Sequence, residues 1–582
     1  MLRNSQNEQF PLNLWLIILV VLSVLTLAHA AIVGIRRLRM YNVLHTQLDT
    51  PAEDGRRASM HTRFTMARFP LAAVNAWRIA MFRWTIPFTD ATLADAILNL
   101  GYVGVVLLWT FVASRNASIA LWASRSAAIA VCQVPLLPVL SSKNNFISFF
   151  TGISHEKMTS LHRAAGRSVV LMFWLHGAGK LYSGTPLTAL SMQMGAASLG
   201  ALTVTFFLSL GPIRRFFYEV FFVSHVLLIS TFMITGWYHT AQVKVSFAPW
   251  MWAGMITWGF DRVFRLARVL YTIARRNRNG SSTRATIELV SEDTVRVYMN
   301  RRVSWKAGQH AFLTFPGISA NPLEAHPFSI ATIPDPPYAG PKSPGEGAQV
   351  SFIIRAKKGM TAKLKNQAAK AGPTGLQVSA VVDGPYGSPP DLTTYSTAVI
   401  IAGGSGITYA ISMFENLIQK RRLGTSACRR VVLVWSIRDE VQIAWIYQQL
   451  IACLGCVPDN LSVSVRIYVT RGKDRAKSAP LANMYGRFDV ALGSFDRNWT
   501  VKEKTTITTF RMVHIENGRP RIDSIIADEA RSSLGAMSVD VCGPTSLVDR
   551  VRSATRASDI AGPMAIARGM PSITLHVESF SM

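Results

Sequence analysis

Acidic residues and cysteines are scarce in this chain of 582 residues. Asp and Glu together number 33 against 61 Lys and Arg, which gives a net charge of +28. The five cysteines are too few for a disulfide framework in a chain of this length; they are Cys132, Cys428, Cys453, Cys456 and Cys542. Cys453 and Cys456 have CxxC spacing, but no second cysteine or histidine pair accompanies them. The sequence therefore argues against a zinc or redox site there.

Hydrophobic runs, in contrast, are long and frequent. Hydrophobic residues make up 49% of the chain and the mean hydropathy is +0.23, which is too apolar for an ordinary soluble protein. We therefore expect a polytopic membrane protein. The seven expected spans are 12–35, 97–113, 120–140, 161–180, 189–210, 219–238 and 250–270. The third is interrupted by Arg125, Pro135 and Pro138.

The basic residues gather in alternate loops between these spans. They are frequent in 36–96, at 214–215 and in 275–278, and they do not form one stripe interleaved with stacking aromatic residues, so nucleic acid is excluded as the partner. The positive-inside rule puts the N-terminus outside and everything after residue 271 in the cytosol. Ala28-His29-Ala30 resembles a signal-peptidase site, but cleavage would leave the arginine-rich loop outside, which favours a retained first span.

Aromatic and basic residues alternate in the stretch 63–84. They are Phe64, Phe69, Trp77, Phe82 and Trp84 together with Arg63, Arg68, Arg78 and Arg83. This mixture is typical of a helix that lies on a membrane surface, so we expect an interfacial anchor.

Two pairs of histidines recur at one spacing. His162 and His176 lie fourteen positions apart, as do His225 and His239. Fourteen helical residues rise ~21 Å and return to within ~40° of the starting direction, so each pair shares a face. A single histidine on an apolar helix is more often a packing residue, but ionisable residues inside spans are rare and usually functional. Side by side, the helices would hold an inner haem between His162 and His225 and an outer haem between His176 and His239.

Beyond a basic linker at 275–283 the apolar periodicity shortens. Four segments alternate apolar and polar residues, as in a small antiparallel barrel: 284–290, 294–299, 350–355 and 376–382. From about 396 the pattern becomes α/β. The expected buried strands are 398–402, 431–435, 463–469 and 538–541.

A glycine-rich turn, Gly403-Gly404-Ser405-Gly406-Ile407-Thr408, joins the first of these strands to an apolar-periodic helix. Glycines there let the backbone approach phosphates, and a helix N-terminus offers unpaired N–H groups. Alone, such a turn is equally consistent with tight packing. Here it follows His326-Pro327-Phe328-Ser329 and Gly384-Pro385-Tyr386-Gly387 and precedes Cys542-Gly543-Pro544. The order of the four motifs is far more specific than any one of them.

On these motifs the chain resembles a fungal-type ferric reductase transmembrane component, within the superfamily that includes the NADPH oxidases, from about residue 90 to 582. The segment from Thr151 to Arg163 resembles the family's entry into its haem helix, and Trp237-Tyr238-His239 its far ligand. The resemblance implies a polytopic α-helical membrane domain with about seven spans and a bis-histidine dihaem core. A ferredoxin-reductase-like module would follow, with an antiparallel β-barrel FAD domain and an α/β NADPH domain. The expected divisions are 1–274, 280–392 and 393–582.

The cofactors that the resemblance implies are two b-type haems, FAD and NADPH. The flavin would be lined by His326, Pro327, Phe328, Ser329, Ile330, Ala331 and Thr332. An aromatic ring at Phe328 would bury the isoalloxazine, and the Ser329 hydroxyl would hydrogen-bond its reactive nitrogen. Arg355 and the turn Gly359-Met360-Thr361 would hold the FAD pyrophosphate. The motif from Gly384 to Gly387 is also expected at the flavin.

The same resemblance implies that Gly403 to Thr408 receive the NADPH phosphates, with Cys542-Gly543-Pro544 beside the nicotinamide. For the 2′-phosphate the candidates are Arg471 and Arg519, because a guanidinium suits a phosphate. Related flavoproteins often finish with an aromatic residue over the flavin. Phe580 would take that place here, unless the end of the chain is a disordered tail. Residues 486–536 fit no part of the pattern.

The implied function is electron transfer from cytosolic NADPH through FAD and two haems to extracellular ferric iron or cupric copper, whether free, chelated or carried by a siderophore. Besides the lipid bilayer, the implied partner is a downstream iron-uptake permease or oxidase. The expected location is the plasma membrane, although a vacuolar membrane satisfies the same topology. The alternative is an NADPH oxidase that makes superoxide, and the extra N-terminal span favours the metal reductase. A haem-containing transporter or receptor would leave the flavin and nucleotide motifs without purpose.

Overall fold

The computed structural model describes residues 2–46, 66–86, 91–111, 118–143, 145–279, 284–301, 303–319, 324–340, 347–471 and 512–578. The chain divides into two compact units. One comprises Met1–Val33 and Thr85–Leu270, and the other comprises Gly34–Trp84 and Tyr271–Met582.

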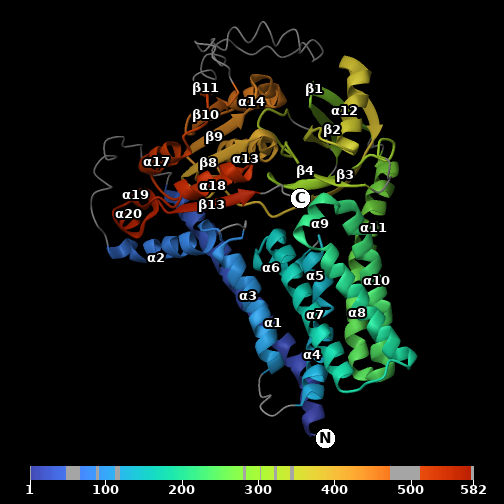
Figure 1. Ribbon diagram of the computed structural model, residues 1–582. Helices are drawn as coiled ribbons and strands as arrows, with labels where there is room; N and C mark the ends of the chain where they lie inside the picture. The colour runs from blue at the N-terminus through green and yellow to red at the C-terminus, as the bar shows by residue number, and fades with distance from the viewer. Residues whose placement is uncertain are drawn as a thin grey trace. The chain divides into compact units, whose positions relative to one another are not determined.

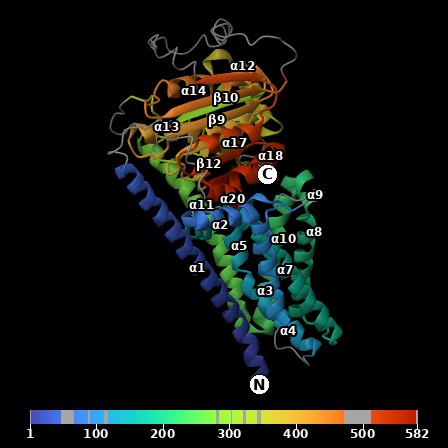
Figure 2. The same cartoon turned by 90° about the vertical axis from the view of Figure 1, so that its left-hand side faces the viewer.

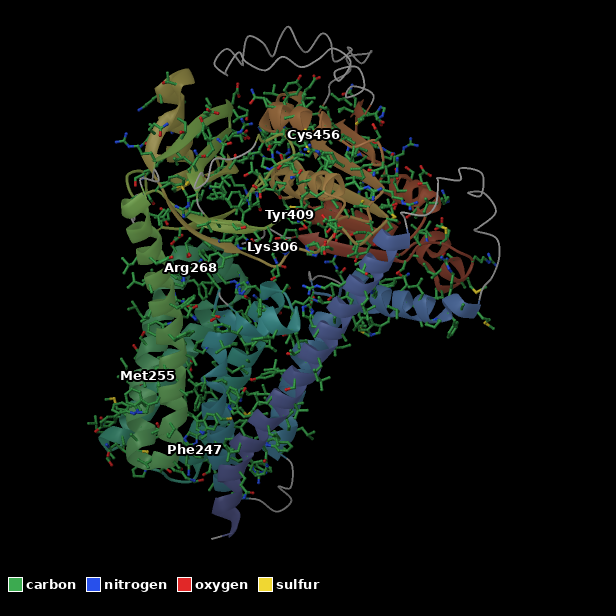
Figure 3. The ribbon with its side chains drawn as sticks, turned by 180° about the vertical axis from the view of Figure 1, so that it is seen from behind. Phe247, Met255, Arg268, Lys306, Tyr409 and Cys456 are labelled. Atoms are coloured by element: carbon green, nitrogen blue, oxygen red, sulfur yellow. The ribbon has the colours of Figure 1, made fainter. Side chains whose placement is uncertain are left out.

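The described residues of the first unit are helical apart from turns and one isolated β-bridge between Thr85 and Thr92, and its first and last helices continue into the second unit. Its helices are α1 (Leu2–Thr46), α3 (Leu93–Phe111), α4 (Ile119–Gln133), α5 (Leu136–Ser141), α6 (Phe146–Thr151), α7 (His155–Tyr182), α8 (Leu190–Leu208), α9 (Gly211–Phe216), α10 (Tyr218–Val243) and α11 (Ala248–Asn279). The long helices run alongside one another as a bundle (Figure 1). Met255 and Arg268 mark the course of α11 in Figure 3, and Phe247 directly precedes its first residue. This helix continues to Asn279, so part of the expected linker at 275–283 is helical.

A helix lies at each of the seven expected spans. Within the described residues, four are long and apolar enough to cross a membrane by length and composition: Gln9–Ile35, Leu93–Phe111, Leu190–Leu208 and Tyr218–Val243. Ile119–Gln133 is apolar but shorter, because the chain turns at Val134 and Pro135 before α5 begins. The number of spans therefore stays a prediction.

The first helix packs as a member of this bundle. Leu14 is 1% exposed, and Trp15 donates its indole N–H to the Cys132 carbonyl at 2.9 Å. The Trp15 ring also stacks on Trp250, with 6.1 Å between ring centroids. Buried indoles need such a partner for their N–H.

The second unit begins, beyond α11, with a β-barrel made of two antiparallel sheets. One has the order β5-β2-β1-β6, from strands β1 (Arg284–Ser291), β2 (Thr294–Arg301), β5 (Ala348–Arg355) and β6 (Leu376–Ser379). The other has the order β4-β3-β7, from β3 (His310–Thr314), β4 (His326–Ser329) and β7 (Val381–Tyr386). Their inward residues share one core, which confirms the predicted antiparallel barrel. The segment expected as one strand at 376–382 is two strands in different sheets, separated at Ala380.

A six-stranded parallel sheet follows the barrel. Its order is β11-β10-β9-β8-β12-β13, from β8 (Thr397–Gly403), β9 (Arg430–Ile437), β10 (Ser462–Val469), β11 (Val513–Asn517), β12 (Met537–Cys542) and β13 (Ile573–Glu578). Helices α13 (Ile407–Arg422) and α14 (Tyr447–Leu454) cover one face, while α17 (Ile522–Ser532) and α18 (Thr545–Ala554) cover the other (Figures 1 and 2). The predicted strands are confirmed, and their unbroken apolar runs reflect burial on both faces.

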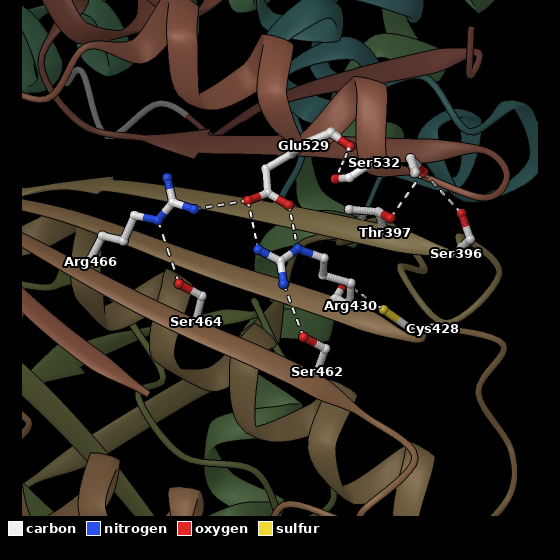
Figure 4. A network of polar contacts seen from close by, with 10 residues as sticks. Ser396, Thr397, Cys428, Arg430, Ser462, Ser464, Arg466, Glu529 and Ser532 are labelled. Carbon is white, nitrogen blue, oxygen red and sulfur yellow. Dashed lines mark hydrogen bonds and ion pairs between the residues drawn. The ribbon is translucent and has the colours of Figure 1, made fainter. Parts of the chain in front are cut away.

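A charged cluster fastens α17 to this sheet. Glu529 is 2% exposed and accepts hydrogen bonds from the guanidinium groups of Arg430 on β9 and Arg466 on β10 (Figure 4). Arg430 also donates to Ser462 at 2.9 Å. A buried carboxylate is tolerated because two arginines pair with it. This contact gives Glu529, in the otherwise unassigned stretch 486–536, a structural role.

The stretch expected to be a membrane anchor packs on the second unit. The described part comprises η2 (Met66–Arg68), α2 (Phe69–Arg78) and η3 (Ile79–Arg83), and it lies against α19 (Ser558–Ala561) and α20 (Pro563–Ala567). Ala72 is 2% exposed within the same apolar core as α17 and α18. Residues 63–65 lie outside the described part of the chain.

Candidate functional site

The four histidines of α7 and α10 lie in the pairs that their spacing suggests. The ring centroids of His162 and His225 are 6.5 Å apart, and those of His176 and His239 are 6.3 Å apart. Two metal–nitrogen bonds of about 2.0 Å, added to the half-widths of two imidazoles, bring ring centroids to roughly 6 Å. Each pair is therefore spaced as a bis-imidazole metal site requires.

Backbone carbonyls set the proton position on three of these rings. The Nδ1 atoms of His162 and His176 lie 2.9 Å from the carbonyls of Leu137 and Ala123 respectively. The Nδ1 atom of His239 lies 2.8 Å from the Ser191 carbonyl. A carbonyl only accepts, so each Nδ1 carries the hydrogen and each Nε2 is left with a free lone pair. This is how metal-binding histidines are usually oriented.

The His225 ring lacks such a carbonyl partner, and the glycines close to the histidines on these helices differ in how much space surrounds them. Among the described residues, the buried Nδ1 of His225 has no hydrogen-bond partner. A Cβ at Gly166 would meet nothing within 4 Å, whereas one at Gly236 would lie 3.0 Å from the Ser198 hydroxyl. Sequence reasoning missed Gly195 on α8, where a Cβ would lie 2.8 Å from the His239 ring. Gly195 therefore leaves room for that imidazole.

The nucleotide motifs meet at the carboxyl ends of β8 and β12. The sheet order changes direction between these strands, and such switch points are where open α/β sheets bind ligands. The turn from Gly403 to Gly406 follows β8 and opens α13, and Cys542-Gly543-Pro544 follows β12 and opens α18. The structure therefore brings together two motifs that are far apart in the sequence.

The two turns touch through their backbones. A Cβ at Gly406 would lie 2.2 Å from the Cys542 carbonyl oxygen, and one at Gly403 would lie 2.7 Å from the Pro544 ring. Gly404 has a φ of +55°, which suits glycine. The Trp435 indole donates to the Gly404 carbonyl at 3.0 Å, and the Thr408 hydroxyl donates to the Ser405 carbonyl at 2.8 Å. A backbone cradle with the N–H groups of a helix start fits a pyrophosphate.

Exposed arginines lie along the same edge of the sheet. Arg438 follows β9, Arg471 follows β10 and Arg519 follows β11. The Arg471 N–H donates to the Arg438 carbonyl at 3.0 Å, and the Gly518 N–H donates to the Val469 carbonyl at 2.9 Å, which keeps the three strand ends together. The sequence suggested Arg471 and Arg519; only the strand order adds Arg438.

The candidate flavin motifs share the sheet β4-β3-β7. In its register Ser329 lies opposite His310, and His310 lies opposite Tyr386. The ring centroids of His310 and Tyr386 are 6.1 Å apart, and those of Phe312 and Tyr386 are 5.6 Å apart. Phe328 packs against the barrel core. Strand β3 therefore lies between the motif at 326–329 and the motif at 384–387. It also contributes two ring side chains, His310 and Phe312, that the sequence analysis did not single out.

The other residues that the sequence suggests for the flavin already contact neighbouring side chains or are buried. The His326 imidazole lies 2.7 Å from the Glu324 carboxylate, and Trp305 donates to the Thr332 carbonyl at 2.7 Å. Ile330 and Ala331 are buried. Arg355 donates to Asp293 at 2.7 Å.

The turn expected at the pyrophosphate lies at the start of a helix. Gly359 precedes helix α12 (Met360–Ala371), and the Thr361 hydroxyl accepts from the Lys357 N–H at 3.1 Å. The Met360 side chain lies in the barrel core, so only its backbone faces the turn. Phe580 lies outside the described residues.

Glu415, a buried carboxyl on α13, links the parallel-sheet part of the second unit to the segment between β4 and β5. It is 0% exposed and accepts a hydrogen bond from the Tyr338 hydroxyl at 2.7 Å. Nearby, Gln449 donates to the Ala331 carbonyl at 2.7 Å. Burial raises the pKa of Glu415 to about 7, although hydrogen bonds from Tyr338 and Gln449 oppose that rise.

We expect Glu415→Gln to raise the unfolding temperature more at pH 8 than at pH 5. The pKa of the folded state exceeds the ordinary 4.5, so folding favours the protonated acid. That stabilisation is complete below the ordinary pKa and is lost as the pH rises through the folded value, by roughly 3 kcal/mol at most. Thermal unfolding of the solubilised full chain measures this difference. Exposed Glu440→Gln is the control, and an equal change at both pH values would contradict the expectation.

Three family models match the chain in succession. A ferric reductase like transmembrane component matches residues 126–236, an FAD-binding domain matches 280–390, and a ferric reductase NAD binding domain matches 395–556. The first includes three of the four histidines, and the third includes both nucleotide turns.

Curated fungal relatives extend the match. Ferric reductase transmembrane component 3 of Saccharomyces cerevisiae is 25% identical over 546 residues, which cover 88% of this chain and 72% of the relative. Ferric/cupric reductase transmembrane component 2 of the same yeast is 25% identical over 556 residues, covering 88% and 71%. A probable cell surface ferric reductase of Aspergillus oryzae is 27% identical over 449 residues, covering 69% and 59%.

A solved structure resembles part of this chain only remotely. A ferredoxin NADP+ reductase from Neisseria gonorrhoeae aligns with 50% of this chain and 96% of its own, at 14% identity and a TM-score of 0.28, which is too distant to add to the assignment. The three family models, in this order along one chain, and the fungal relatives that share most of its length agree. The chain therefore combines a ferric reductase transmembrane domain with FAD-binding and ferric reductase NAD-binding domains, and it is similar over most of its length to fungal ferric reductase transmembrane components.

Proposed function

We propose that this chain moves electrons from cytosolic NADPH across a membrane to an external metal ion, with ferric iron or cupric copper as the acceptor. The proposal depends most on the two histidine pairs, His162 with His225 and His176 with His239. Each pair joins α7 to α10 at the spacing that a bound metal requires. The acceptor is supported by the yeast relatives, which are named ferric or ferric/cupric reductase components.

The second unit would hold the electron donor. Backbone N–H groups of the turn from Gly403 to Thr408 would bind the NADPH phosphates, and Cys542 to Pro544 would lie beside the nicotinamide. Burial raises the pKa of the Cys542 thiol, so its sulfur stays neutral there. The 2′-phosphate would meet the exposed guanidinium groups of Arg438, Arg471 and Arg519.

The barrel would hold FAD at 326–332 and 384–387, with Arg355 and the turn at 359–361 toward its pyrophosphate. In the first unit, His162 and His225 would bind an inner haem, and His176 and His239 an outer haem. When bound, the flavin converts two-electron into one-electron transfer, and the haems accept single electrons. The corresponding divisions of the chain are 1–274, 280–392 and 393–582.

This arrangement gives the transfer a direction. The positive-inside pattern puts the second unit in the cytosol, and an electron that moves outward from a negative cytosol gains up to ~2.3 kcal/mol per 100 mV. The chain is a multi-pass membrane protein, and we assign it to the plasma membrane because the Aspergillus relative is named for the cell surface. An uptake permease or oxidase would then receive the reduced metal.

Intact cells that express the full chain test this proposal. We expect reduction of an impermeant ferric chelate, followed with an impermeant ferrous indicator, to exceed that of cells without the chain. Superoxide is measured in parallel as cytochrome c reduction that superoxide dismutase suppresses. Superoxide as the dominant product would replace the metal reductase by an oxidase, and the absence of both activities would contradict electron export.

A further inference from the structure

The segment 66–84, called the strap below, contacts three helices in the parallel-sheet part of the second unit, residues 397–578, which is called the nucleotide-binding half below. The Arg83 guanidinium donates to the carbonyl of Thr555, which ends α18. Asn75 donates its amide to the carbonyl of Ala561, the last residue of α19, at 2.7 Å. Arg68 donates at 3.3 Å to the carbonyl of Ile566 in α20, which also accepts from the Gly569 N–H at 3.1 Å. The last carbonyls of a helix lack partners within the helix, so the strap satisfies groups at the ends of α18 and α19 that otherwise need a cap.

These contacts are buried, which makes the strap part of the fold of that half. Arg83 is 1% exposed and Asn75 is 0% exposed. Burial, and to a lesser degree the neighbouring Arg78, lower the pKa of Arg83 to about 10. The cation is tolerated because it also donates to the Ile573 carbonyl at 2.5 Å, and because a helix C-terminus carries partial negative charge.

The opposite face of the strap is exposed and carries no charged residue of the strap itself, and the Arg556 guanidinium lies 4.3 Å from the centroid of the Trp84 ring at one end of it. All three charged residues of 66–86, Arg68, Arg78 and Arg83, donate hydrogen bonds to the nucleotide-binding half. The large exposed side chains of the strap are Met66, Phe69, Val74, Trp77, Phe82 and Trp84. The rings of Trp77 and Phe82 also contact each other, with 5.3 Å between their centroids, and a group of large exposed apolar side chains usually marks an interaction site.

Chain connectivity indicates what covers this face. Thr85, the next residue after the strap, pairs with Thr92 in an isolated β-bridge, and the Ile86 N–H donates to the Ala91 carbonyl at 2.9 Å. Leu93 then begins α3, one of the helices apolar enough to cross a membrane. One peptide step of 3.8 Å and one bridge of about 5 Å keep Trp84 within roughly 10 Å of the residue that precedes this span. Indole rings prefer that depth, at the border between water and lipid.

We propose that the strap binds two partners at once: its capping face holds the nucleotide-binding half, and its apolar face lies in the headgroup region of the bilayer. The strap then ties that half to the membrane at a point separate from its chain connection through α11. The arginines that the sequence suggested for the lipid surface serve the protein contact instead, and the aromatic residues alone provide the membrane contact.

Lipid quenching of a fluorescent label tests the membrane contact in the full chain. Cys456 is replaced by serine, since the other four native cysteines are buried, and a bimane is attached at Trp77→Cys in single-chain nanodiscs. Interfacial helices lie ~5–10 Å deep, so lipids brominated near the headgroup end of their acyl chains should lower the emission about twofold relative to unbrominated lipids. Phe69→Cys is a second exposed position, and Glu440→Cys, exposed on the same half, is the control.

Equal emission in both lipids at Trp77 and Phe69 would overturn the proposal, and it would point to a protein partner or a second copy instead. This measurement does not depend on the proposed function. If that function also holds, Trp77→Asp should lower reduction of external ferric chelate several-fold in cells. The solubilised variant should reduce ferricyanide from NADPH as the wild type does. Unchanged chelate reduction by Trp77→Asp would show that electron transfer to the external chelate does not depend on the apolar face of the strap.

Discussion

Replacement of His176 by alanine is expected to remove about half of the haem absorbance of the purified chain and to abolish reduction at the outer surface. His176 and His239 face each other at 6.3 Å between ring centroids, and the Ala123 carbonyl orients the His176 ring so that Nε2 is free. A bis-histidine haem that loses one ligand is held far more weakly. Haem content is measured by pyridine haemochrome spectra, and surface activity by reduction of an impermeant ferric chelate.

The control for this substitution lies on the same helix. His155→Ala removes an exposed imidazole near the start of α7 and should leave the haem content unchanged. His239→Ala should reproduce the loss seen with His176→Ala, and the double variant should lose no more, because both remove the same site. FAD content should stay constant in all variants. Full haem content in His176→Ala would disprove the pairing.

Replacement of Gly406 by alanine is expected to abolish NADPH oxidation by disrupting the two nucleotide turns. The added Cβ would lie 2.2 Å from the Cys542 carbonyl oxygen and 2.8 Å from its carbonyl carbon. Both are backbone atoms, so relief requires the turns after β8 and β12 to separate. Overpacking of this kind costs about 1–3 kcal/mol, and it displaces the N–H groups that would bind phosphate. NADPH-dependent ferricyanide reduction by the solubilised chain measures the loss.

Gly317→Ala is the matched control for this second substitution. The same methyl group there meets nothing within 4 Å, so activity and unfolding temperature should be unchanged. The haem spectrum of Gly406→Ala should also be normal, because its defect lies in the second unit. Wild-type turnover in Gly406→Ala would mean that the contact between the turns does not serve the nucleotide.

Local patterns in the sequence predicted much of the secondary structure. Alternation of apolar and polar residues correctly indicated the strands of the barrel, and continuous apolar runs indicated those of the parallel sheet, because both patterns follow from which faces are buried. The error at 376–382 has the same origin. Alternation continues across Ala380, but the chain there leaves one sheet for another, and that change depends on distant partners.

The arginines of the strap show a different kind of error. A stretch that mixes arginines with aromatic residues has the same composition whether it forms a membrane anchor or a contact with protein. Arg83 lies in a protein contact because helix ends formed by residues far along the chain present carbonyls to it and to its neighbour Asn75. Composition reports that a cation is present, but not which acceptor it reaches.

The sequence by itself determined the histidine interval, the order of the flavin and nucleotide motifs and the alternation of charge between loops, since each is a periodic or local property. Only the tertiary structure decided that Gly406 meets Cys542, that Arg438 joins Arg471 and Arg519, and that Gly195 makes room for His239. These contacts join segments from different strands and helices. They depend on strand order and helix packing, which arise from the burial of the whole chain rather than from any one stretch of it.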